Sequence, residues 1–242
     1  MEKIDNCPKC GSELQGPFCS QCGRPARSRA IQFGSFFNVV FEYLTNWERK
    51  LFTTIKELFR RPGLVIQSFI EKDREQFYHP IKFLLFWASI NFLISQWLGV
   101  SAFSPNESQN EFEQRISKIF EEYGSFLWIL CLPFTALGNY IIWRSKDPKF
   151  VHHSIFAAYL IGMNLLISIP LFFLKRYIPD PIWLQKILPP LLTLCMCTYF
   201  VYNWSKRNWL IALLAGILIF FFTFIGMFFY FMLAYILVSL SI

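Results

Sequence analysis

The feature that most constrains the fold of this chain is a run of 34 residues without a charged side chain, from Trp209 to Ile242. About 20 helical residues are enough to cross the hydrocarbon core of a bilayer. Only 16% of the 242 residues are charged and 55% are hydrophobic, whereas roughly a quarter of the residues in a soluble domain are charged. The sequence therefore excludes a soluble globular enzyme and predicts an integral membrane protein.

Five apolar segments have the length of a transmembrane helix. They are Ile81–Phe103, Gly124–Trp143, Ser154–Leu174, Ile187–Trp204 and Trp209–Ile242. We expect an all-α membrane protein with about five transmembrane helices in residues 81–242. The last segment forms either one long tilted helix or a hairpin that reverses near Gly226, and the lack of polar turn residues favours the single helix.

The basic residues of the loops predict the orientation of these helices. If the N-terminus is cytoplasmic, residues 1–82, 144–153 and 205–208 are cytoplasmic and hold 18 of the 23 Lys and Arg residues. The outer loops, 104–123 and 175–186, hold 5. We therefore expect a multi-pass protein of the cytoplasmic (inner) membrane with a cytoplasmic N-terminus.

Two cysteine pairs near the N-terminus predict a metal site in residues 1–24. Cys7 and Cys10 form one CxxC motif, and Cys19 and Cys22 form the second. Each spacing lets one tight turn present two sulfurs to one ion, and four thiolates complete a tetrahedral Zn²⁺ site. Such a closed shell has no position for water, so we expect a structural zinc ribbon whose folding energy comes from the metal. Redox CxxC motifs are the alternative.

A basic linker and a helical segment, residues 25–80, join this ribbon to the bundle. Apolar residues repeat at helical spacing from Phe33 to Phe59, which predicts an amphipathic helix ended by Pro62. This helix either lies in the membrane interface or packs as a cover on the bundle. The arginines that follow the ribbon, Arg24, Arg27 and Arg29, favour contact with anionic lipid over nucleic acid.

Few side chains of the apolar segments could carry chemistry. Apart from Lys82, no Asp, Glu, Lys or Arg lies inside them, which argues against an ion-coupled carrier. Polar residues such as Asn91, Asn139 and Asn164 either bond between helices or line a passive pore.

The three histidines of the chain, His79, His152 and His153, precede spans on the predicted cytoplasmic side. They form a candidate interfacial cluster for a metal or for acid–base chemistry, or are polar residues at headgroup level. Adjacent helical residues point about 100° apart, which weakens a site shared by His152 and His153.

Several motifs together resemble a known family. One match lies before the first span: the Arg-Arg-Pro-Gly of Leu58–Gly63, followed by Phe69–Glu71, Arg74, Tyr78–Pro80 and Lys82–Phe83. A second match lies in the middle spans and consists of Leu132–Phe134 with Ala136, and of His153 with Phe156–Ala157. The chain resembles an uncharacterised family of bacterial membrane proteins, a domain of unknown function, that starts with a zinc ribbon. It departs from that pattern at Lys72, at His152 and at Tyr159, where the family has a second histidine. The resemblance implies a bacterial membrane and the ribbon-plus-bundle architecture, and it implies no activity.

These features predict a non-enzymatic membrane protein whose zinc ribbon docks a protein partner or regulates assembly on the cytoplasmic face. A channel or passive transporter for ions or small solutes is the first alternative. A membrane-embedded enzyme acting on lipid through His79 or His153 is the second.

Overall fold

The computed structural model describes residues 10, 12–13, 20–22, 49–71, 76–100, 124, 126–178 and 187–240. The chain divides into two compact units, residues 1–47 and 48–242. The first unit contains the predicted ribbon, of whose ligands only Cys10 and Cys22 are described. Most of the predicted amphipathic segment Phe33–Phe59 also lies outside the described residues, so the fold below is that of the second unit.

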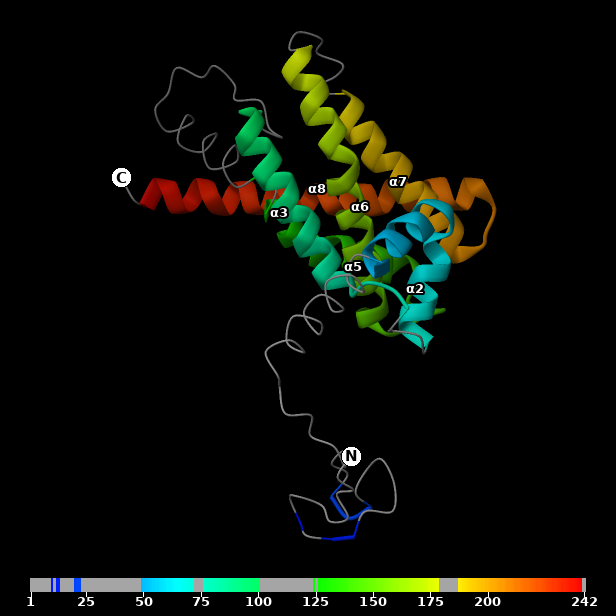
Figure 1. Cartoon of the computed structure of the whole chain (residues 1–242). Coiled ribbons are helices and arrows are strands. Elements are labelled where there is room, and N and C mark those ends of the chain that lie inside the picture. The colour runs from blue at the N-terminus through cyan, green and yellow to red at the C-terminus, as the bar shows by residue number, and fades with distance from the viewer. Residues whose placement is uncertain are drawn as a thin grey trace. The chain divides into compact units, whose positions relative to one another are not determined.

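Every regular element among the described residues of the second unit is a helix (Figure 1). The helices are α2 (Pro62–Glu71), α3 (Pro80–Leu98), α5 (Leu132–Trp143), α6 (Phe150–Tyr177), α7 (Leu188–Ser205) and α8 (Trp209–Leu240), and residues 49–60 and 126–130 are also helical. Proline occupies the first or second position of α2, α3, α5 and α7. The first turn of a helix tolerates proline because its N–H groups have no partner within the helix.

Four helical segments are long and apolar enough to cross a membrane. They are Pro80–Leu98, Phe126–Trp143, Phe150–Tyr177 and Trp209–Leu233. The fourth of the five predicted spans forms α7, which falls outside this set. Its two prolines and the polar side chains near its end make α7 less apolar than the other four.

The last predicted span is one continuous helix, as the lack of turn residues indicated. Gly226 lies inside α8 and marks a close helix contact, not a reversal. A Cβ added there would lie 3.0 Å from the ring of Phe134 in α5. The structure thus excludes the hairpin alternative.

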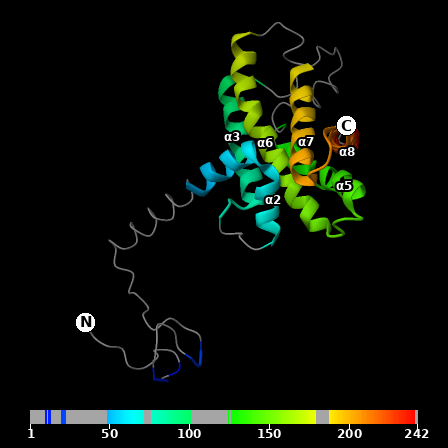
Figure 2. The same ribbon diagram turned by 90° about the vertical axis from the view of Figure 1, so that its right-hand side faces the viewer.

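Side-chain contacts define the relative direction of two pairs of long helices, and α8 lies crosswise to α3, α6 and α7 (Figure 1). Helices α3 and α6 run side by side in the same direction, because ring contacts join Phe83 to Tyr159 near their starts and Trp97 to Phe173 near their ends. Helices α5 and α8 are antiparallel, because a Cβ on Gly138 would meet Phe222, whereas Phe134, earlier in α5, contacts Phe229, later in α8. Figure 2 shows α3, α6 and α7 side by side.

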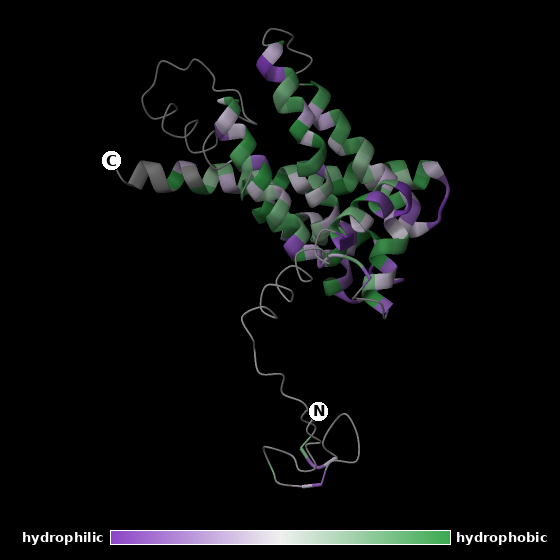
Figure 3. Cartoon of the chain, viewed as in Figure 1, coloured by the Kyte–Doolittle hydropathy of each residue, from purple (hydrophilic) through white to green (hydrophobic). Residues whose placement is uncertain are grey.

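The packing of the helices gathers the polar segments at one end of the unit. We call this end, made of α2, the α5–α6 turn (residues 144–149) and the α7–α8 turn (residues 206–208), the polar end. Hydrophilic residues concentrate there in Figure 3, while the helices between the ends are mainly hydrophobic. Within this unit, α2 and the two turns, which the basic-residue count assigned to one side of the membrane, therefore share one end of the bundle.

The outward surface of α8 is apolar. Leu210, Leu214, Phe221 and Phe228 are each more than half exposed, and most other large apolar residues of this helix are exposed as well. So large an apolar surface is costly in water and is suited to lipid. Together with the four candidate spans, it identifies the chain as an integral membrane protein.

Helix 49–60 packs on the bundle with one face. Leu58 is fully buried, and the buried Thr54 hydroxyl accepts a hydrogen bond of 2.8 Å from the main-chain N–H of Tyr78. The Tyr199 hydroxyl of α7 donates to the Phe59 carbonyl at 2.6 Å. These contacts favour the cover interpretation for residues 49–60, while Phe52 stays exposed on the other face.

Candidate functional site

His153 is the most deeply placed ionisable group at the polar end. It lies in the first turn of α6 and is fully buried, as is Asn139 of α5. The Asn139 side-chain amide lies 3.0 Å from Nδ1 of His153, and Nε2 of His153 lies 2.9 Å from the Asp147 carbonyl oxygen. Both ring nitrogens are therefore engaged.

These two contacts define the tautomer of His153. A carbonyl oxygen can only accept, so Nε2 carries the hydrogen and donates to Asp147. In the neutral ring, Nδ1 is then an acceptor, and the Asn139 NH₂ group donates to it. With both nitrogens used inside the protein, His153 joins α5, the α5–α6 turn and α6, and has no ring nitrogen left for a metal or a substrate.

Aromatic rings surround this histidine. The His153 ring makes edge contacts with Tyr140 at 5.4 Å and with Trp204 of α7 at 5.5 Å between centroids. Trp204 in turn contacts Trp143, over which lie the Lys146 ammonium at 5.5 Å and the Arg207 guanidinium at 6.0 Å. This cluster ties α5, α6 and α7 together beneath two cations.

Asp147 organises the α5–α6 turn, although the sequence did not mark it as a site residue. Its Oδ2 lies 2.7 Å from Nδ1 of His152, and its Oδ1 accepts from the Lys149 main-chain N–H at 3.2 Å. A carboxylate that orients one ring nitrogen of a histidine is a common arrangement in acid–base sites. His152 and Asp147 are each about one-fifth exposed, so this pair, unlike His153, can be reached from solvent. The only sequence signal available was the Asp147-Pro148 pair in the loop between two predicted spans.

The third predicted histidine lies elsewhere at this end. His79 precedes α3 and contacts the ring of Phe69 of α2 edge-on, with 5.3 Å between centroids. Phe69 also contacts Tyr159, which at 1.5 Å per residue lies about 9 Å along α6 from His153. The structure thus brings His152 and His153 together around Asp147 and places His79 against α2.

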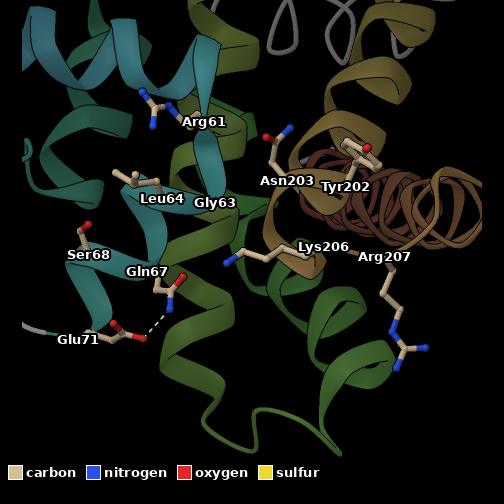
Figure 4. Close-up of a pocket in the computed structure, with 10 residues that line it drawn as sticks. All are labelled: Arg61, Gly63, Leu64, Gln67, Ser68, Glu71, Tyr202, Asn203, Lys206 and Arg207. Atoms are coloured by element: carbon tan, nitrogen blue, oxygen red, sulfur yellow. Dashed lines mark hydrogen bonds between the residues drawn. The ribbon is translucent and has the colours of Figure 1, made fainter.

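A groove of about 600 Å³ opens at the polar end between α2 and the end of α7. Figure 4 shows its lining, which comes from Arg61, Gly63, Leu64, Gln67, Ser68, Glu71, Tyr202, Asn203, Lys206 and Arg207. Gln67 donates to Glu71 at 2.7 Å. Gly63 lets α2 approach the α7 main chain, because a Cβ there would lie 2.7 Å from the Asn203 carbonyl carbon.

Polar residues inside the bundle connect helices. The Asn91 amide of α3 donates to the Leu165 carbonyl of α6 at 2.9 Å and contacts the Ser168 hydroxyl at 2.5 Å. The hydroxyls of Thr135 and Thr223 lie 3.0 Å apart between α5 and α8. Bonds of this kind hold helices together in lipid, where an unpaired polar group is costly.

The described residues contain no group of three or more His, Cys, Asp or Glu side chains able to hold a metal ion. Cys7 and Cys19 lie outside those residues, and the Cys10 sulfur lies 3.1 Å from the Ser12 hydroxyl. The predicted Cys7, Cys10, Cys19, Cys22 site therefore remains a prediction from the sequence.

A family described as a protein of unknown function, DUF3667, matches residues 48–92. The match spans helix 49–60, α2 and most of α3, and so includes Arg61, Gly63 and Leu64 of the groove. The chain matches no curated protein and no solved structure. The resemblance to an uncharacterised family is thus confirmed over this segment, which is less than half of the chain and does not reach the predicted ribbon.

Proposed function

We propose that this protein is a non-enzymatic docking or regulatory protein of a bacterial cytoplasmic membrane, with its polar end on the cytoplasmic side. The observation that carries the proposal is that His153 uses both ring nitrogens inside the protein, one with Asn139 and the other with the Asp147 carbonyl. A buried histidine with both nitrogens engaged supports a scaffold and not a reacting centre. The exposed basic residues at the same end supply a surface for partners.

The zinc ribbon is the proposed docking element. Four thiolates, from Cys7, Cys10, Cys19 and Cys22, are a donor set that suits Zn²⁺, and such a site stabilises a segment too short for a hydrophobic core. The chain enters the bundle through helix 49–60, which packs against α7. A partner held by the ribbon would therefore be linked to the polar end of the bundle.

Crosslinking in intact membranes followed by mass spectrometry tests this function. The wild type is compared with the Cys10→Ser, Cys19→Ser protein, and Cys195→Ser serves as control because Cys195 is an exposed cysteine of α7 outside the motif. We expect one zinc per chain, and a captured partner, in the wild type and the control, and neither in the double variant. Equal capture by all three proteins would refute the docking role of the ribbon.

An enzyme acting on lipid is the second candidate, and the His152–Asp147 pair is the observation that favours it. The pair has the geometry of a histidine oriented by a carboxylate and is accessible. This moves the candidate base from His79 or His153 to His152. The test is whether the His152→Gln protein rescues a deletion strain. A loss of function at normal protein levels would favour the enzyme, and full rescue would refute the enzyme hypothesis.

A channel or passive transporter for ions or small solutes has less support. Its candidate pore residues Asn91 and Asn139 are buried and hydrogen-bonded to neighbouring helices. Flux of ions or small solutes through proteoliposomes, lost on substitution of Asn164, would restore this candidate.

A further inference from the structure

The groove between α2 and α7 is positively charged. Arg61, Lys206 and Arg207 line it together with one carboxylate, Glu71. Figure 4 places Glu71 and Arg207 on opposite sides, with Lys206 between them. The groove therefore attracts anions on the side formed by the α7–α8 turn.

Lys206 is the cation best placed to bind a ligand. Arg61 lies 4.0 Å from Glu57, and Arg207 lies over the Trp143 ring, so each has a neighbour within the protein. Lys206 forms no ion pair within the described part of the chain. In Figure 4 its side chain extends from the end of α7 across the groove toward α2. An ammonium group held in this way can donate several hydrogen bonds to one anionic group.

The backbone at Lys206 is unfavourable for lysine. Its φ is 52°, and it is the one non-glycine residue with positive φ among those described. It caps α7 in the left-handed conformation, a position that usually holds glycine or asparagine. Strained residues of this kind occur preferentially where a side chain is needed for function.

The rim of the groove has the character of a membrane interface. Leu64 and Tyr202 line the groove and are 41% and 49% exposed, and Trp209, the first residue of α8, is 64% exposed. Exposed Tyr and Trp side chains are typical of the headgroup level of a bilayer. A ligand that fits has an anionic head for Lys206 and an apolar tail for the rim.

We propose that this groove binds the phosphate of a membrane phospholipid headgroup, with Lys206 as the phosphate donor and Leu64 and Tyr202 against the start of the acyl chains. A soluble phosphate ester carries the same phosphate group and could bind to the same cations. The apolar rim favours the lipid. This site does not involve the zinc ribbon, so the lipid proposal can be tested separately from the docking function.

Native mass spectrometry of the full chain in a non-ionic detergent tests the proposal, with dioctanoyl phosphatidylglycerol as the probe. We expect Lys206→Gln to weaken binding about tenfold, the size of one lost charge-assisted hydrogen bond. The matched control is Lys149→Gln, an equal charge change at an exposed residue of the same end that does not line the groove. Equal affinities of the two variants would overturn the site.

Two further arms identify the source of the phosphate and remove misfolding as an explanation. Glycerol phosphate should compete at least tenfold more weakly than the lipid, and dioctanoylglycerol, which lacks phosphate, should not compete. If glycerol phosphate binds as tightly as the lipid, the ligand is soluble and the lipid proposal is wrong. Lys206→Gly relieves the left-handed backbone, so it should keep its melting temperature and still lose affinity; retained affinity would refute the role of Lys206.

Discussion

Replacing Gly63 by alanine should separate α2 from α7. The added Cβ would lie 2.7 Å from the Asn203 carbonyl carbon and 3.0 Å from the Trp204 Cα, and these are main-chain atoms that no rotamer change can move. Inserting a methyl group into such a contact costs about 1–3 kcal/mol. Because Gly63 is near the start of α2, the better helix propensity of alanine offsets little of this cost.

The assay is thermal unfolding in one detergent, followed by tryptophan fluorescence. For a domain of this size, 1 kcal/mol corresponds to roughly 2–4 °C, so the expected decrease in melting temperature is about 2–12 °C. Gly226→Ala is the matched control, since the nearest atoms to its Cβ would be side-chain atoms of Phe134 at 3.0–3.1 Å and not main chain, and mid-helix alanine gains about 1 kcal/mol over glycine. If Gly63→Ala melts no lower than Gly226→Ala, the main-chain contact between α2 and α7 is not as close as described.

Three other substitutions test contacts between helices. Asn139→Ala leaves Nδ1 of the buried His153 without a donor and should cost about 1–3 kcal/mol, seen as a lower melting temperature; an unchanged value would contradict the assigned bond. Thr135→Val and Thr223→Val, singly and together, form a double-mutant cycle whose coupling should be about 0.6 kcal/mol, and zero coupling would show that the hydroxyls do not interact. Tyr199→Phe removes the donor to the last turn of helix 49–60 and should increase proteolysis before α2, whereas unchanged cleavage would mean that this bond does not hold the helix.

The helices could be predicted from the sequence because lipid and core both select apolar residues. Each of the five predicted segments overlaps one of the long helices, yet their ends differ. Helix α6 was predicted as Ser154–Leu174 and extends over Phe150–Tyr177. Charged and polar residues at its ends lower the local hydropathy but do not prevent helix formation, so a hydropathy window ends too early.

The surroundings of the histidines could be predicted only in part. The angle of about 100° between adjacent helical positions correctly separated His152 from His153. It could not tell which of the two is buried, because that depends on Asn139, 14 residues earlier, and on the carbonyl of Asp147 in a turn. Such contacts arise from the packing of α5 on α6 and leave no periodic pattern in the sequence.

The groove was beyond prediction for a similar reason. Lys206 was counted only as a basic loop residue, and nothing in its neighbourhood marks a left-handed cap that would usually hold glycine. Gly63 was noted only as part of the Arg-Arg-Pro-Gly motif, whereas its role is to let α2 approach the α7 main chain. Both roles depend on residues about 140 positions apart in the sequence and become visible only in the assembled bundle.

The α7–α8 connection acts as a short mechanical linkage. Only Lys206, Arg207 and Asn208 separate the two helices, and three residues reach at most about 10 Å when fully extended. Because the connection is this short, a change in the tilt of α8 would also move the end of α7. Since α8 carries the most lipid-exposed surface, a bilayer that is thinner, thicker or under tension would turn this helix first. Lys206 and Arg207 lie in this connection, so we expect a change in the tilt of α8 to change the shape of the groove.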